Sequence, residues 1–260
     1  MQAWRSLTSS ALDLLFPPRC AGCRRRGAWF CERCRREVVE IVPPFCERCG
    51  QGIAGGRLCA TCRQHPLQID GLRAVAYLEG GLRQAIHAFK YNGVRALAQP
   101  LGDILAGGFT RHALQADLIA PVPLHTARHN QRGFNQSLLL AQRLATHAGM
   151  PVDGGDLQRV RDTRSQVGLN AHDRHDNVQN AFAWQGASLR GRRVLLIDDV
   201  CTTGATMEAC AAALRSAGAA SVWGLALARE RWGIKQAGSR ACPAGRELPC
   251  PVRRADLDRW

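Results

Sequence analysis

The chain has 260 residues, enough for one or two domains with a sizeable core. Its apolar content of 46% is ordinary for a globular protein, and no run approaches the roughly 18 uninterrupted apolar residues of a membrane-spanning helix. The formal net charge of +14 is compatible with a nucleic-acid partner. The basic residues are almost all arginine, however, and a GC-rich coding sequence can produce such an excess of arginine without a nucleic-acid partner. Composition therefore argues against a protein built from membrane-spanning helices and leaves the function open.

The first residues contain a short apolar stretch that Asp13 interrupts. A strongly basic start and a small-residue cleavage site are both missing, so the stretch does not have the pattern of a signal peptide. We expect residues 1–16 to form an amphipathic helix packed on the protein, with contact to a membrane surface as the less favoured alternative. We expect no stable membrane insertion and a cytoplasmic location.

The segment 20–62 holds four CxxC pairs. Structural zinc takes four ligands in a tetrahedron, and a CxxC turn offers two thiolates to one metal. Regular pairs without a signal peptide argue against a disulfide module, and a redox motif would show a single CxxC. We therefore predict a double zinc ribbon over residues 17–66 with two structural Zn²⁺ ions. The predicted ligands are Cys20, Cys23, Cys31, Cys34, Cys46, Cys49, Cys59 and Cys62.

The pairing of these cysteines has two solutions. Sequential ribbons would use the first four cysteines for one metal and the last four for the other, whereas an interleaved arrangement would join the first CxxC to the third. The short spacers favour the sequential version. With two tetrathiolate sites the formal charge falls to about +10. Cys201, Cys210, Cys242 and Cys250 lack this spacing, and Cys210 is expected in the core.

Strand and helix patterns alternate after a link at residues 63–72. Strand patterns cover 72–79, 117–124, 193–200 and 221–229, and helical patterns cover 82–91, 96–114, 134–149 and 203–219. Alternating elements with nearly continuous apolar strands predict an α/β fold whose parallel sheet is covered on both faces. We assign this domain to residues 67–230. The remaining residues, 231–260, show no period and are expected to form a disordered tail.

The stretch "VLLIDDVCTTGAT", residues 194–206, places two acids at the end of a buried strand and a small, hydroxyl-rich turn before a helix. The free N–H groups of a helix start suit a phosphate monoester. A Walker-type loop is not indicated, because no lysine follows Gly204. The two carboxylates can accept hydrogen bonds from the hydroxyls of a sugar. The stretch therefore predicts a site for a ribose 5-phosphate unit, against the alternative of a solvated strand end and a simple helix cap.

This stretch resembles the phosphoribosyl pyrophosphate (PRPP) signature of type I phosphoribosyltransferases. "PVPLHTARHNQRGFNQS" (121–137), "RVRDTRSQVGLNAHDRHDNVQNAF" (159–182) and the CxxC array are similar to the ComF family, which includes GntX-like proteins and is linked to natural competence and DNA uptake. The resemblance covers roughly residues 15–229. It implies a type I phosphoribosyltransferase domain behind an N-terminal double zinc ribbon.

The resemblance also implies roles for individual residues. Asp198 and Asp199 would hold the ribose hydroxyls, one of them through Mg²⁺. Arg132 and Lys90 would meet the pyrophosphate, with Gly133, Asn135 and Gln136 in the same loop as Arg132. The 5-phosphate would be held by Thr202, Thr203, Gly204, Ala205 and Thr206. Part of residues 164–182 could close over PRPP as a lid. The sequence assigns no catalytic residue, and the acceptor of the phosphoribosyl group is not visible in it.

Two functional classes follow from these patterns. The first is a phosphoribosyltransferase that uses PRPP and Mg²⁺ on an unidentified acceptor. The second is a non-catalytic PRPP-sensing module whose ribbons bind single-stranded DNA or a DNA-uptake helicase. The candidate phosphate contacts in the ribbon are Arg24, Arg25, Arg26, Arg33, Arg35 and Arg36. A purely structural zinc scaffold is a third, weaker interpretation.

Overall fold

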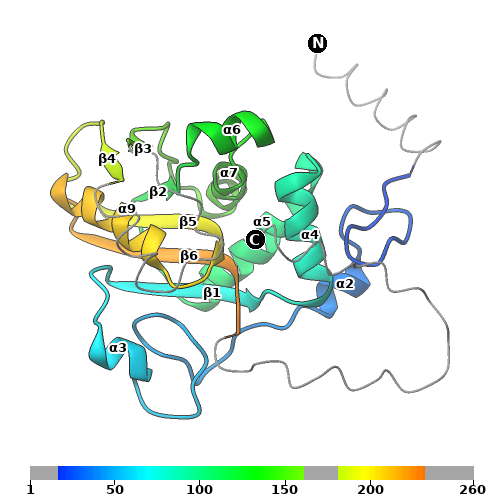
Figure 1. Ribbon diagram of the computed structural model, residues 1–260, viewed down its shortest axis with the longest axis horizontal. Helices are drawn as coiled ribbons and strands as arrows, with labels where there is room; N and C mark the ends of the chain where they lie inside the picture. Colours follow the sequence, from blue (N-terminus) through cyan, green and yellow to red (C-terminus); the bar gives the residue numbers. More distant parts are fainter. Residues whose placement is uncertain (1–16, 161–180, 232–260) are drawn as a thin grey trace.

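The computed structural model describes residues 17–160 and 181–231, and its centre is a four-stranded sheet (Figure 1). The strand order is β1-β6-β5-β2, and every pairing in this sheet is parallel. The bounds are β1 (Gly71–Tyr77), β2 (Leu118–Pro121), β5 (Arg193–Cys201) and β6 (Ser221–Arg229). The predicted α/β class with a parallel sheet is therefore confirmed, and the carboxyl ends of these strands share one edge of the domain.

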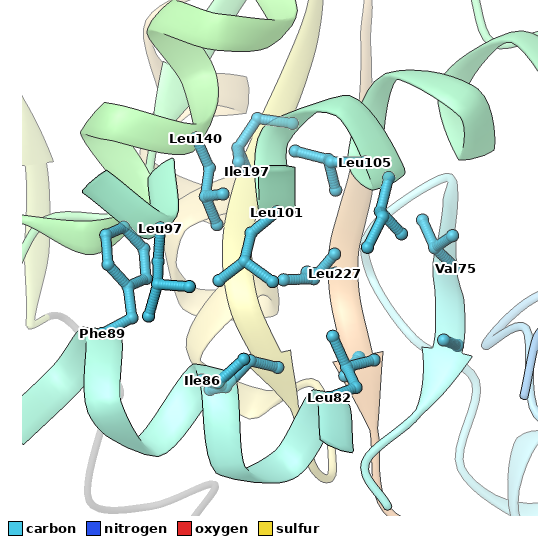
Figure 2. Packing of buried hydrophobic residues seen from close by; sticks show 14 of the residues in the cluster. Val75, Leu82, Ile86, Phe89, Leu97, Leu101, Leu105, Leu140, Ile197 and Leu227 are labelled. Atoms are coloured by element: carbon cyan, nitrogen blue, oxygen red, sulfur yellow. The ribbon is translucent and has the colours of Figure 1, made fainter. Parts of the chain in front are cut away.

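Helices cover both faces of this sheet (Figure 1). The first face carries α4 (Gly80–Tyr91), α5 (Ala98–Arg111) and α7 (Gln136–Ala148), and the second carries α9 (Ala205–Ser216). Figure 2 shows the core under the first face, where Ile86, Leu101 and Leu140 point from three helices toward Ile197 and Leu227 of the sheet. Successive side chains of β5 point to opposite faces of the sheet, as in any strand. Leu195 and Ile197 therefore lie in the core under the first face, and Val194 and Leu196 lie in the core under the second face.

Several short elements were not predicted. A 3₁₀ turn, η1 (Arg95–Leu97), precedes α5, and α6 (Thr126–Arg132) follows β2. The strands β3 (Leu157–Arg159) and β4 (Phe182–Trp184) form an antiparallel pair that packs beside α9. Elements of three to seven residues contain too few positions to show a period, which explains why the pattern did not reveal them.

The predicted long elements are present with shifted ends. The strand expected over 117–124 is shorter, because β2 covers only Leu118–Pro121. The Asp117 side chain accepts from the Arg193 N–H at 2.9 Å just before β2, and Pro123, which has no N–H to donate, follows it. Helix α7 starts at Gln136 because the Asn135 side chain caps it, accepting from the Ser137 N–H at 2.9 Å. The helix expected over 203–219 starts two residues later, after Gly204.

The two cysteine segments lie on the side of the sheet next to β1 (Figure 1). They contain α2 (Glu32–Arg36) and α3 (Ala60–Gln64). The chain between them runs along the outer edge of β1, with the Ile41 N–H donating to Val75 at 2.9 Å and the Tyr77 N–H donating to Val39 at 2.9 Å. This segment covers the backbone groups of an edge strand and attaches the ribbons to the sheet.

The helix expected over residues 1–16 and the tail expected over 231–260, apart from Arg231, lie outside the described residues. Within the described ranges, no helix has the length and the apolar character that crossing a bilayer requires.

Candidate functional site

The strand β5 carries its apolar run into two carboxylates and then turns into α9 through Gly204. Gly204 has φ +90°, a left-handed conformation, and a Cβ built there would lie 2.6 Å from Leu72 Cδ1. Only glycine meets both conditions without strain. Thr203 Oγ1 accepts from the Ala205 N–H at 3.3 Å, which shapes the turn as it enters the helix. The turn therefore presents the positive end of a 12-residue helix, a suitable place for an anion.

Asp198 lies in a partly buried position between β5 and the start of α7. Its Oδ1 accepts from Ser137 Oγ at 3.0 Å and from the Asp199 amide at 2.8 Å. Burial, followed by the charge of Asp199, raises the pKa of Asp198 to about 7, although Lys90 and the two donated hydrogen bonds oppose this shift. A proton on this carboxyl group is therefore retained up to neutral pH.

Asp199 is paired with Lys90. Asp199 Oδ1 lies 3.0 Å from Lys90 Nζ, and the two side chains are only 8% and 12% exposed. Lys90, in the last turn of α4, therefore lies beside the adjacent carboxyl groups of Asp198 and Asp199. The resemblance implies that Lys90 also meets a pyrophosphate, and this role stays a prediction.

Arg132 ends α6 and contacts Tyr91, the residue after Lys90, and Gln136, the residue before Ser137. Its Nη1 donates to Gln136 Oε1 at 3.1 Å, and its guanidinium lies over the ring of Tyr91, 4.9 Å from the centroid. Arg132 Nε and Gln136 Nε2 are buried and have no hydrogen-bond partner among the described residues. Buried donors of this kind are uncommon because each costs free energy, so they suit a site that a polar ligand completes.

A pH prediction follows from the carboxyl pair. An unfolded aspartate has a pKa of about 3.9, so between about pH 4 and pH 7 folded Asp198 keeps a proton that the unfolded chain has lost. Stability falls as pH rises through this window, on the order of 1 kcal/mol per pH unit for one proton. Asp198→Asn removes the titration. The stability of the wild type relative to Asp198→Asn should fall between pH 5 and pH 7 in urea denaturation with zinc present, and a constant difference contradicts the raised pKa.

The eight cysteines form two clusters in sequential order. In each cluster the four Sγ atoms lie within 4.8 Å of one another, so the interleaved pairing is not what the structure shows. Zn–S bonds of about 2.3 Å in a tetrahedron place sulfurs about 3.8 Å apart. The Sγ–Sγ distances are 3.7 Å for Cys20–Cys34, 3.5 Å for Cys23–Cys31 and 3.8 Å for Cys49–Cys59. The clusters are Cys20, Cys23, Cys31 and Cys34, and then Cys46, Cys49, Cys59 and Cys62.

The sulfurs also receive backbone hydrogen bonds, as metal-binding thiolates do. The Cys31 N–H donates to Cys20 Sγ at 3.3 Å, and the Cys62 N–H donates to Cys59 Sγ at 3.4 Å. The pKa values differ within the first cluster: burial opposes ionisation of Cys20, but amide donors from Cys23 and Cys31 lower its pKa to about 6, whereas burial raises the pKa of Cys34. Donor number, spacing and hydrogen bonding therefore all fit a tetrahedral zinc ion in each cluster.

Lys90 contacts Asp199, and Arg132 contacts Tyr91 and Gln136, which are the sequence neighbours of Lys90 and Ser137. Because Ser137 in turn contacts Asp198, the predicted Lys90, Arg132, Asp198 and Asp199 lie in one region. Sequence reasoning missed Ser137, which contacts Asp198, and Arg229, which contacts Thr202 at the start of the turn. Ser137, which bonds Asp198, ends the segment 121–137 and has no local signal that sets it apart from other serines. Arg229, an arginine directly after the apolar run of β6, was predicted only as the end of a strand. The stretch expected to form a lid lies almost wholly outside the described residues.

Comparison with known proteins identifies the families of the two parts of the chain. Residues 11–63 match the double zinc ribbon domain family, and residues 135–235 match the phosphoribosyl transferase domain family. Competence protein F of Haemophilus influenzae is 32% identical over 226 residues, covering 81% of this chain and 97% of that protein. The DNA utilization protein YhgH of Salmonella typhimurium is 34% identical over 219 residues, covering 80% and 96%.

A more distant relative, competence protein ComFC of Bacillus subtilis, is 27% identical over 207 residues, covering 76% of this chain and 83% of that protein. The predicted resemblance is thus confirmed, with its zinc-ribbon domain ahead of a phosphoribosyltransferase-type α/β domain. The chain belongs to the ComF family.

Proposed function

We propose that the protein binds PRPP at the carboxyl end of β5. We also propose that it takes part in DNA utilisation, the process named in the YhgH relatives. The observation that carries the proposal is the continuous stretch in which two carboxylates lead through a left-handed glycine into the start of α9. The 5-phosphate would lie in the turn of Thr202, Thr203, Gly204, Ala205 and Thr206. The ribose hydroxyls would bind Asp198 and Asp199.

The pyrophosphate would lie toward Arg132 and Lys90. Two features support this placement. The buried donors Arg132 Nε and Gln136 Nε2 have no partner among the described residues, and they would find acceptors in pyrophosphate oxygens. Lys90 supplies a second cation within reach of the acids. Carboxylates and phosphate oxygens are the ligands that Mg²⁺ prefers, so Asp198 and Asp199 are the protein groups that would hold it with PRPP.

In a transferase, the bond between ribose C1 and the pyrophosphate oxygen breaks while an acceptor atom bonds C1, and pyrophosphate leaves with the bonding electrons. The protein would stabilise the leaving charge through its cations and would need no nucleophile of its own. A PRPP sensor would bind the same ligand without releasing pyrophosphate. Pyrophosphate release measured across candidate acceptor bases and amines separates these two forms of the proposal.

Asp199→Asn should weaken PRPP binding by tenfold or more, because losing a hydrogen bond to a charged group costs about 1.5–3 kcal/mol. Equilibrium dialysis with radiolabelled PRPP and Mg²⁺ measures this. Glu79→Gln is the matched control, since Glu79 follows β1 at the same edge of the sheet and pairs with Arg231 at 3.0 Å. If both variants, verified as folded, bind PRPP like the wild type, the assignment of Asp199 is wrong.

A second candidate function is binding of single-stranded DNA by the first ribbon. Arg24, Arg25, Arg26 and Arg35 are exposed there, and Trp29 is 40% exposed beside them. Arginines can follow a phosphate backbone, and an exposed indole can stack on a base. The names of the YhgH relatives, which refer to DNA utilisation, agree with such a partner.

Replacing Arg25 and Arg26 by glutamine should weaken DNA binding at low salt and reduce the salt slope. Two lost phosphate contacts on a single strand correspond to a change of about 1.4 in the slope of log K against log salt. Arg190→Gln with Arg192→Gln is the charge-matched control, because these arginines are exposed at the opposite end of the sheet. Fluorescence anisotropy with a labelled oligonucleotide measures both. Equal losses in the two double variants would show a general charge effect and exclude the ribbon as the contact surface.

A further inference from the structure

We propose that the second cysteine cluster supports the phosphate-binding turn through Arg229, so that metal in the cluster and a sugar phosphate in the turn strengthen each other's binding. The second cluster is Cys46, Cys49, Cys59 and Cys62, and the turn is residues 202–206. The ligand named here rests on the proposed function. The support itself rests on contacts within the protein.

Arg229 connects the two places directly. It ends β6, is 3% exposed, and donates through Nη1 to the Cys49 carbonyl oxygen. Its Nη2 lies 3.4 Å from the Thr202 carbonyl oxygen. One rigid, planar guanidinium therefore holds the backbone of a metal-ligand residue and the backbone of the turn at once.

The buried positive charge of Arg229 also couples metal in the second cluster to a phosphate in the turn. Its described hydrogen-bond partners are carbonyl oxygens, and its buried Nε has no partner among the described residues. A buried cation needs compensating negative charge. A zinc ion with four thiolates carries a net charge of about −2, and a phosphate monoester carries up to about −2 as well. Each site, when filled, stabilises the cation that lies between them.

A second path of contacts runs through β1. The Leu72 N–H donates to the Arg48 carbonyl at 2.7 Å, within the first CxxC turn of the second cluster. Gly50 has φ +69°, and its backbone lies so close to β1 that a Cβ built on Gly50 would be 2.5 Å from the Leu72 carbonyl oxygen. The side chain of Leu72 in turn packs against Gly204. The cluster therefore positions the strand on which the turn rests.

The first cluster provides an internal control. It packs at the start of α4, where a Cβ on Gly81 would lie 3.4 Å from Cys34 Sγ. Its cysteines share the zinc chemistry of the second cluster but contact a different element. If a sugar phosphate acts through Arg229, it should therefore strengthen metal binding in the second cluster and leave metal binding in the first cluster unchanged.

Thermodynamic linkage makes this testable from the metal side. If metal raises the affinity of the turn for a ligand, the ligand raises the affinity of the cluster for metal by the same factor, typically about 5–150-fold. The zinc-loaded full chain is challenged with a chelator, with and without ribose 5-phosphate. Freed cysteines are alkylated and quantified by peptide mass spectrometry. We expect alkylation of the second cluster to slow by about fivefold or more, with the first cluster unchanged.

Two variants at the end of β6 locate the coupling. Arg229→Gln should abolish the protection of the second cluster. Arg231→Gln should retain it, because Arg231 pairs with Glu79 at 3.0 Å instead of bridging the cluster and the turn. Equal protection of both clusters, or no protection while calorimetry shows that ribose 5-phosphate binds, overturns the coupling.

A ligand-free measurement separates this proposal from the proposed function. Cys59→Ser disrupts the second cluster and Cys23→Ser the first. Hydrogen exchange of the amides of residues 202–208 should accelerate in Cys59→Ser and not in Cys23→Ser. If ribose 5-phosphate and PRPP fail to bind while this difference is seen, the proposed function is wrong and the structural support stands. If the two variants exchange alike over these residues, the support is absent.

Discussion

Gly204→Val is expected to reduce PRPP binding by roughly 5- to 150-fold, the largest effect of any single change at the turn. A β-branched residue at φ +90° is strained, and its Cβ would meet Leu72. Backbone strain of this kind costs about 1–3 kcal/mol. The turn can escape the strain only by leaving the conformation that places amide groups around a phosphate. Equilibrium dialysis with labelled PRPP and Mg²⁺ measures the loss.

Gly218→Val is the control for this change. Gly218 follows the other end of α9, has φ +97°, and a Cβ there would lie 3.3 Å from the Arg190 nitrogen. We expect Gly218→Val to lower the thermal midpoint as Gly204→Val does but to keep PRPP affinity. If the two variants lose affinity equally, the loss reflects stability, and the turn has no special part in binding.

Cys46→Ser is expected to have the largest effect on stability. The wild type should contain about two zinc ions per chain by elemental analysis, and the variant about one, because a hydroxyl group cannot replace the thiolate. Structural zinc supplies roughly 10–16 kcal/mol of apparent binding free energy, and much of that folding free energy is lost with one ligand. Calorimetric unfolding should show early melting of the second ribbon.

Cys210→Ser separates metal binding from burial. Cys210 is fully buried in α9 and belongs to neither cysteine cluster. Serine at this position costs about 1–3 kcal/mol for a buried hydroxyl group but leaves the zinc content at two. Less than one equivalent of zinc in the wild type, or equal zinc loss in the two variants, would contradict the two-site assignment.

Much of the fold could be predicted because its long elements have strong periods. The apolar runs of β5 and β6 identified a parallel sheet, and regular CxxC pairs identified the cysteine clusters. The ends of elements depended on side-chain contacts that no period shows. The Asn135 side chain caps the first turn of α7 and so sets where that helix begins. The Asp117 side chain accepts from the Arg193 N–H just before β2 begins.

For the candidate site, the sequence indicated a local pattern of residues but not their contacts, and the roles of these residues toward a ligand stay predictions. Asp198 and Asp199 were found from local sequence alone, because two adjacent acids between a buried strand and a small turn form a compact and recognisable pattern. Their partners come from distant segments: Ser137 is 61 residues from Asp198, and Lys90 pairs with Asp199. Arg229 bonds Cys49, a residue 180 positions away. Such pairs depend on how the sheet is assembled, and a single sequence carries no sign of them.

A crystal structure of the zinc-loaded protein with PRPP and Mg²⁺ tests the central claim most directly. We predict density for the 5-phosphate in the turn of residues 202–206, with the ribose hydroxyls within hydrogen-bonding distance of the Asp198–Asp199 pair and the pyrophosphate toward Arg132. A sugar phosphate bound elsewhere on the protein, or an empty turn in crystals grown at millimolar PRPP, would contradict the account.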